Sequence, residues 1–148
     1  MRTVICGIGN KMKGDDGVGS AIASELEREI RKDNIMILDC ASAPENFTGK
    51  VKSFNPDHVV LIDAVKMGRD PGHVEMVESE NIKGLLFSTH QTPLKMLIDY
   101  IQQQLPSTKI SFIGIEPKHT IFGSDMSEEV KAAMDELKTS LTNLLMGL

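Results

Sequence analysis

Short apolar runs alternate along the chain with longer segments whose apolar residues recur at helical spacing. Four runs have the length and content of buried strands: residues 3–8, 35–38, 59–62 and 110–115. Residues 73–77 instead alternate between apolar and polar positions, directly after the turn-forming residues 69–72. This alternation predicts a half-exposed strand at the edge of a sheet.

Helical spacing and start signals mark the remaining elements. Four segments are predicted to be helical: residues 18–30, the short segment 44–54, residues 92–105 and residues 127–145. Residues 18–30 carry an apolar side chain at every fourth position, which is one face of a helix. Pro44 and Pro93 fit the first turn of a helix, where a missing amide hydrogen costs nothing, and Pro106 ends the third segment.

The order of these elements predicts the fold class. Strands that alternate with helices require right-handed crossovers, and these place helices on both faces of a mainly parallel sheet. The fold is therefore predicted to be α/β, a three-layer α/β/α sandwich. A length of 148 residues fits one domain spanning residues 1–148 with one core.

Composition and charge exclude several classes of protein. A formal net charge of -5 argues against binding to a nucleic-acid backbone, which needs a clustered basic surface. No apolar stretch approaches the roughly 18 residues that span a bilayer, and the first residues do not resemble a signal peptide. We therefore expect a cytoplasmic protein without membrane insertion. Cys6 and Cys40 match no zinc or redox spacing and are predicted to be buried thiols.

The glycine-rich loop at residues 7–17 could suggest dinucleotide binding, with Asp39 as the acid that binds a ribose. However, Met12 stands where that fingerprint requires Gly. Asp15 and Asp16 also place two negative charges where a pyrophosphate would bind. The sequence therefore disfavours a dinucleotide-binding oxidoreductase.

Three side chains are predicted to meet at the carboxyl ends of the strands, where parallel sheets gather functional groups. Asp16 lies in the first loop, Asp63 follows the apolar run 59–62, and His90 precedes the helix that opens at Thr92. Taken singly, each of these residues could have a structural role only, as a helix cap or a solvated loop residue. Together, two carboxylates and one imidazole suit a borderline divalent metal such as nickel or zinc and leave coordination positions open. The three other histidines are predicted to be structural or solvated: His58, His73 and His119.

Several short motifs occur in one order along nearly the whole chain. They are Gly7-Ile8-Gly9-Asn10, residues 14–19, residues 42–46, Ile62-Asp63-Ala64, Met67-Gly68, Pro71-Gly72, residues 89–94 and residues 112–117. In this combination the sequence resembles the NiFe-hydrogenase maturation endopeptidases, particularly the branch that serves formate-hydrogenlyase and energy-converting hydrogenases. The resemblance implies a five-stranded sheet with one antiparallel strand.

The resemblance also implies an activity and a site. It implies an endopeptidase that removes the C-terminal extension of the nickel-loaded large-subunit precursor. The family's nickel-contacting positions fall on Asp16, Asp63 and His90, which become the expected catalytic and metal-binding residues. Nickel would be supplied by the precursor, which is the expected partner, and the enzyme is expected to be a monomer.

The residues leave the chemistry of hydrolysis open. Nickel could activate a bound water, or Asp16 and Asp63 could act as acid and base, with Asp15 as a helper. Two other classes also remain open at this point. One is a nickel-dependent checkpoint or chaperone that binds the precursor without cutting it, and the other is a metal-dependent amidase that ignores hydrogenase precursors.

Overall fold

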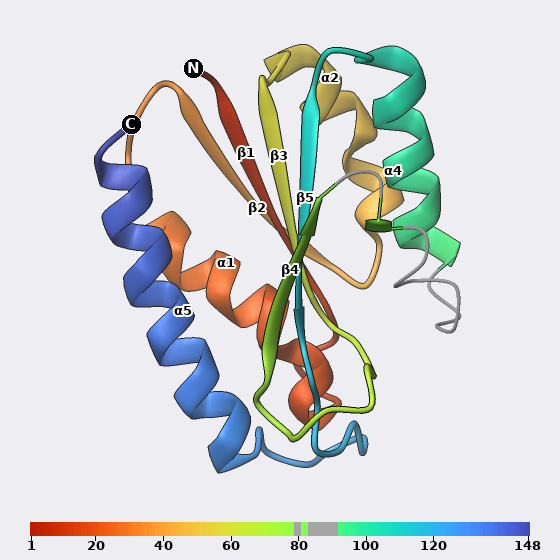
Figure 1. Ribbon diagram of the computed structural model, residues 1–148, viewed down its shortest axis with the longest axis vertical. Helices are drawn as coiled ribbons and strands as arrows, with labels where there is room; N and C mark the ends of the chain where they lie inside the picture. Colours follow the sequence, from red (N-terminus) through yellow and green to blue (C-terminus); the bar gives the residue numbers. More distant parts are fainter. Residues whose placement is uncertain (79–80, 83–91) are drawn as a thin grey trace.

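The computed structural model describes residues 1–78, 81–82 and 92–148. Its sheet has five strands in the order β2-β1-β3-β5-β4. Their bounds are Thr3–Ile8 for β1, Ile35–Ala41 for β2, His58–Ala64 for β3, Val74–Glu78 for β4 and Lys109–Ile115 for β5. β1, β2, β3 and β5 are parallel, and β4 pairs with β5 antiparallel at one edge (Figure 1). The predicted edge strand and the mostly parallel sheet are confirmed.

Helices cover both faces of the sheet, as predicted. α1 (Val18–Glu29) and α5 (Glu128–Met146) lie on one face, and α2 (Thr48–Phe54) and α4 (Thr92–Gln104) lie on the other (Figure 1). Each layer has its own apolar cluster, one under α1 and α5 and one under α2 and α4. None of the helices in the described parts of the chain is both long enough and apolar enough to cross a membrane. Cys6 and Cys40 are buried, unpaired thiols, as expected.

Two strands continue further than their apolar runs. β2 reaches Ala41 rather than stopping at Leu38. β3 reaches Ala64, and Asp63 pairs with Gly114 of β5 within the ladder. Asp63 therefore lies within β3, one residue before its end, rather than after it, because backbone pairing with β5 continues two residues past Ile62.

The first turn of α1 is packed directly onto the sheet through Gly19. A Cβ atom at this position would lie 2.2 Å from the carbonyl oxygen of Ile62 in β3 and 2.5 Å from that of Ile8 in β1. These are backbone atoms, so they cannot turn aside as a flexible side chain could. Only glycine lets the helix begin this close to the strand ends, and this closeness fixes the position of the preceding loop.

We expect Gly19→Ala to lower the free energy of unfolding by about 3 kcal/mol, because the new methyl group displaces backbone atoms in a close-packed interior. Urea denaturation measures the change. Gly49→Ala in α2 is the matched control, since no atom of the described chain lies within 4 Å of a Cβ atom there. The control should raise stability by about 0.5–1 kcal/mol through its helix propensity. A Gly19→Ala protein as stable as the control would contradict this account of the packing.

Candidate active site

A small pocket opens at the carboxyl ends of the parallel strands. Its volume is about 80 Å³, which is room for a few water molecules or for a metal ion with part of its coordination shell. Its walls come from the loop after β1, the end of β2, the end of β3 and the first turn of α4. The lining residues are Ile8, Gly9, Asp16, Ser42, Pro44, Asp63, Pro93 and Leu94. Residues far apart in sequence thus form one site at the edge where a parallel sheet gathers function.

Asp16 and Asp63 both line this pocket, as the argument from the strand ends predicts. Asp63 is held by β3 and is only 2% exposed. Asp16 lies in the 3-10 turn η1 (Gly14–Gly17) and is partly exposed, and the backbone N–H of Asn10 donates to its Oδ2 over 2.9 Å. Two carboxylates with different access to solvent therefore face one small volume. Their chemical role stays a prediction.

His90, the third predicted ligand, lies outside the described residues. Within residues 1–78, 81–82 and 92–148, no group of three His, Cys, Asp or Glu side chains is arranged to hold a metal ion. The described chain therefore supplies two of the three predicted ligands to one pocket. The complete set stays a prediction.

The loop that carries Asp16 folds back on itself at Gly9. The φ angle of Gly9 is 143°, and a Cβ atom there would lie 1.9 Å from the carbonyl oxygen of Asp16. A glycine is required for both reasons. The loop can therefore bring the backbone of Asp16 against the end of β1, where its side chain reaches the pocket.

Asp15 points away from this pocket, although it is the next residue in the chain. Its fully buried carboxylate accepts hydrogen bonds from the backbone N–H groups of Lys118 (2.8 Å), His119 (3.3 Å) and Ser127 (2.7 Å) and from the Ser127 hydroxyl (2.8 Å). The suggestion that Asp15 assists the hydrolysis is therefore not supported. Asp15 instead ties the first loop to the segment that leads into α5.

The environment of Asp15 favours its ionised form. Burial alone would raise the pKa of the carboxyl group, but the hydrogen bonds from Ser127, Lys118 and His119 together outweigh burial and lower the pKa below its ordinary value. The carboxylate is therefore a charged acceptor at neutral pH, which makes its four hydrogen bonds stronger than neutral ones.

Asp39 is occupied within the fold. Its carboxylate accepts hydrogen bonds from the hydroxyl groups of Ser20 and Ser24 on α1, and Lys11 lies 3.4 Å away. Burial alone would raise the pKa of Asp39, but the hydrogen bonds from Ser20 and Ser24 help to outweigh burial, and the pKa lies below its ordinary value. The residue that imitates a ribose-binding acid thus joins α1 to β2. This agrees with the sequence argument against a dinucleotide.

Comparison with known proteins identifies the family. Residues 20–143 match the family model described as hydrogenase maturation protease. The chain belongs to the hydrogenase maturation protease family. It is therefore a peptidase of hydrogenase maturation, and the family expected from the sequence motifs is confirmed.

Individual relatives agree with this family membership. The hydrogenase 3 maturation protease of Escherichia coli is 31% identical over 91% of this chain and 85% of its own length. The crystal structure of a NiFe hydrogenase maturation protease HycI from Thermococcus kodakarensis superposes with a TM-score of 0.89 at 34% identity, covering 98% of this chain and 92% of that one. The solution structure of the endopeptidase HycI from Escherichia coli gives 0.81 at 30% identity, with coverage of 94% and 88%. The fold of this maturation protease is thus the fold of its relatives.

Sequence reasoning from charge and metal chemistry did not single out the remaining walls of the pocket. Ser42 and Pro44 follow β2, while Pro93 and Leu94 begin α4. They entered the sequence analysis as parts of family motifs. Their position next to a strand end or a helix start was the available signal, because these places share the rim with Asp63.

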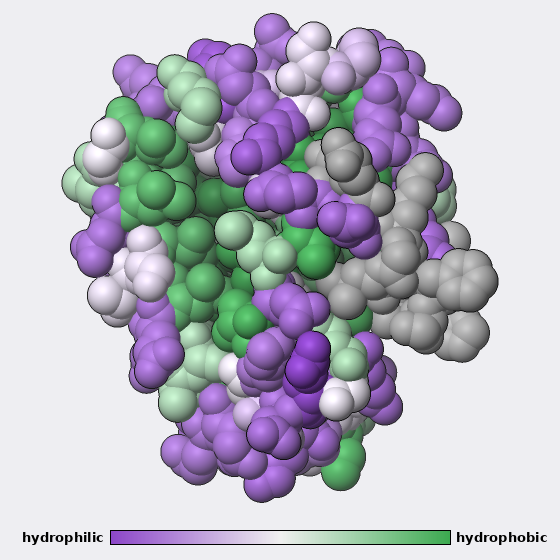
Figure 2. All heavy atoms as spheres, viewed as in Figure 1, coloured by the Kyte–Doolittle hydropathy of each residue, from purple (hydrophilic) through white to green (hydrophobic). Residues whose placement is uncertain are grey.

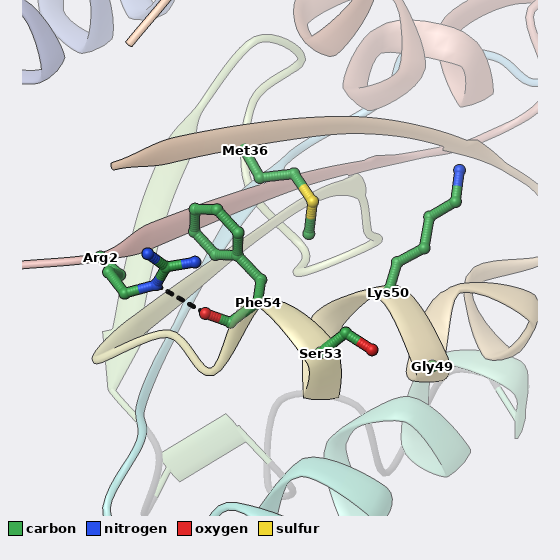
Figure 3. A pocket seen from close by; sticks show the side chains of 6 residues that line it. All are labelled: Arg2, Met36, Gly49, Lys50, Ser53 and Phe54. Atoms are coloured by element: carbon green, nitrogen blue, oxygen red, sulfur yellow. Dashed lines mark hydrogen bonds between the residues drawn. The ribbon is translucent and has the colours of Figure 1, made fainter. Parts of the chain in front are cut away.

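A second hollow of this maturation protease lies between α2, β2 and the residue before β1 (Figure 3). Its volume is about 530 Å³, larger than that of the carboxylate pocket. Its lining residues are Arg2, Met36, Gly49, Lys50, Ser53 and Phe54. Arg2 is engaged there, because its Nε donates to the carbonyl oxygen of Phe54 over 2.6 Å and its guanidinium lies 4.0 Å from the Phe54 ring. None of the described residues that line this hollow carries a carboxylate or an imidazole, so this hollow offers no such metal ligand or acid-base group.

Proposed function

We propose that this maturation protease hydrolyses one peptide bond near the C-terminus of a nickel-loaded hydrogenase large-subunit precursor, and that it does so at the pocket of Asp16 and Asp63. Membership of the hydrogenase maturation protease family supports the reaction and the kind of substrate. The observation that carries the choice of site is that two carboxylates from separate elements line one pocket of about 80 Å³. In this proposal the enzyme works as a monomer, because one chain supplies that pocket.

The donor atoms in the pocket fit a nickel ion that belongs to the substrate. Carboxylate oxygens are ligands for borderline divalent metals, and an imidazole such as that of the predicted ligand His90 would complete the set. Nickel bound in the precursor would supply a Lewis acid near the scissile carbonyl. The role of Asp16 and Asp63 is then to hold the precursor at one place and in one orientation, which lowers the entropic part of the barrier.

In this proposal Asp63 also transfers the proton, while Asp16 only orients the substrate. Asp63 is buried, lines the pocket and is held by the β3 ladder, so it can accept a proton from a water molecule as that water attacks the scissile carbonyl carbon. The same carboxyl group then returns the proton to the nitrogen of the leaving amine as the C–N bond breaks. Asp16, fixed by the N–H of Asn10, keeps the substrate oriented throughout.

Intact-mass measurement of a large-subunit precursor incubated with the purified protein tests this proposal. We expect the mass of the intact precursor to be replaced by two new masses, that of the processed large subunit and that of the released C-terminal peptide. A precursor that binds but stays whole would favour the checkpoint function. Hydrolysis of short amide substrates with no action on any precursor would favour the amidase.

A further inference from the structure

Two tight turns stand side by side on the rim that carries the active site. In the first, the N–H of Lys13 donates to the carbonyl oxygen of Asn10 over 3.0 Å, and in the second the N–H of Ser124 donates to that of Ile121 over 3.1 Å. The N–H of Gly123 joins them by donating to the carbonyl oxygen of Met12 over 2.7 Å. Segments more than a hundred residues apart thus form one surface.

Both turns carry large exposed apolar side chains, although the exposed Lys11 and Lys13 flank Met12 in the first turn. Met12 is 61% exposed, Ile121 is 63% exposed and Phe122 is 67% exposed. Gly, Pro, Asn, Asp and Ser dominate such turns, because the tips face water. The same end of the molecule is otherwise largely hydrophilic on the face drawn in Figure 2. We call these three residues the turn-tip patch. Single exposed apolar residues are ordinary, but three on two bonded turns are not.

Hydrogen bonds and close packing of the two neighbouring buried residues, Asp15 and Gly14, hold the turn-tip patch in place. The buried carboxylate of Asp15 binds the backbone at Lys118, His119 and Ser127, on both sides of the second turn. Gly14 packs so closely that a Cβ atom there would lie 2.8 Å from Nδ1 of His119. An ordered apolar surface loses little entropy when a partner covers it, so it is preorganised for binding.

The turn-tip patch is continuous with the active site. The N–H of Asn10 holds the carboxylate of Asp16, while the side-chain oxygen of Asn10 accepts a hydrogen bond from the N–H of Met12 over 2.9 Å. The ends of such a turn lie within about 7 Å of each other. Asn10 therefore bonds both Met12 and the carboxylate of Asp16, and this part of the patch lies on the same loop as a wall of the pocket.

We propose that the turn-tip patch is a docking surface for the hydrogenase large-subunit precursor, and that it binds an apolar segment next to the bond to be cut. This inference rests on the proposed function. Burial of large apolar side chains supplies affinity, and their fixed distance from Asp16 helps to place the scissile bond. The patch thus selects a folded precursor over a short peptide that only fills the pocket.

The test is the double variant Met12→Ser with Phe122→Ser, compared with the wild-type protein in precursor binding and cleavage. Both side chains are exposed, so the fold should be retained. We expect the Kd for the precursor and the KM for cleavage to rise at least about tenfold, with the loss in KM rather than in kcat. Leu144→Ser is the matched control, because Leu144 is 63% exposed near the far end of α5, about 25 Å along the helix from Ser127.

Unchanged Kd and KM in the double variant would overturn the docking surface and leave the proposed function standing. An equal loss in Leu144→Ser would also overturn it, because the effect would then belong to exposed apolar residues in general. A wild-type protein that neither binds nor cleaves the precursor would overturn both proposals.

Discussion

Asp63→Asn is expected to lower the rate of precursor cleavage by about a hundredfold to ten thousandfold, the range that general acid-base catalysis supplies. Asn has the same shape but cannot accept a proton from the attacking water. Asp63 is 2% exposed and its backbone is paired with β5 in the ladder, so its carboxyl group is held at a fixed place in the pocket. Single-turnover cleavage, read by intact mass, measures the chemical step without product release.

The control for Asp63→Asn is Asp135→Asn on the exposed surface of α5. It makes the same change in charge and should leave the rate within about twofold, because surface substitutions away from the site have small effects. The circular dichroism spectrum of both variants should match that of the wild type. A rate for Asp63→Asn within tenfold of the wild type would show that Asp63 is not the base.

Asp15→Asn is expected to lower the free energy of unfolding by about 2–4 kcal/mol, because hydrogen bonds to a charged group contribute about 1.5–3 kcal/mol each. The four donors around the carboxylate need two acceptor oxygens, and an amide keeps only one. The amide nitrogen would also face N–H groups. Thermal denaturation at pH 7 should show a Tm lower by about 5–15 °C.

The effect of Asp15→Asn should depend on pH. The pKa of Asp15 is lower in the folded protein than the ordinary value of about 4. Its stabilisation is therefore complete above that ordinary value and is lost as the pH falls through the lower folded pKa. The difference in stability between wild type and variant should shrink as the pH falls below about 4.

Glu128→Gln is the matched control for Asp15→Asn. Its side chain is 90% exposed at the start of the same helix, α5. The control should cost less than about 1 kcal/mol at every pH, since exposed ion pairs contribute little. A difference between wild type and Asp15→Asn that stayed constant down to pH 2 would contradict the charged role of Asp15.

The fold could be predicted because its core elements are marked by local patterns. Residues 3–8 are apolar enough to be buried on both faces, and they form β1 without error. Residues 73–77 were correctly predicted as an edge strand, but the alternation does not follow burial there, because Val74 and Met76 are exposed and Glu75 is half-buried. The end of β2 was missed because Asp39 interrupts the apolar run, although α1 satisfies its carboxylate through Ser20 and Ser24. A bond to another element leaves no local pattern.

The candidate site was predictable only in part. Asp16 and Asp63 follow from the rule that functional groups gather at the carboxyl ends of parallel strands, and one pocket does contain both. The role of Asp15 could not be predicted, because its partner Ser127 lies 112 residues away in the sequence. Helix capping would have assigned Asp15 to its own helix α1, whereas it holds the start of α5.

The most direct test of the central claim is to mix the purified protein with nickel-loaded and with nickel-free precursor of the same large subunit and to compare intact masses. Recognition of substrate nickel by Asp16 and Asp63 predicts cleavage of the loaded form, with the nickel-free form left whole. Equal cleavage of the two forms would contradict the account, because the carboxylate pocket would then act without the metal that it is proposed to recognise.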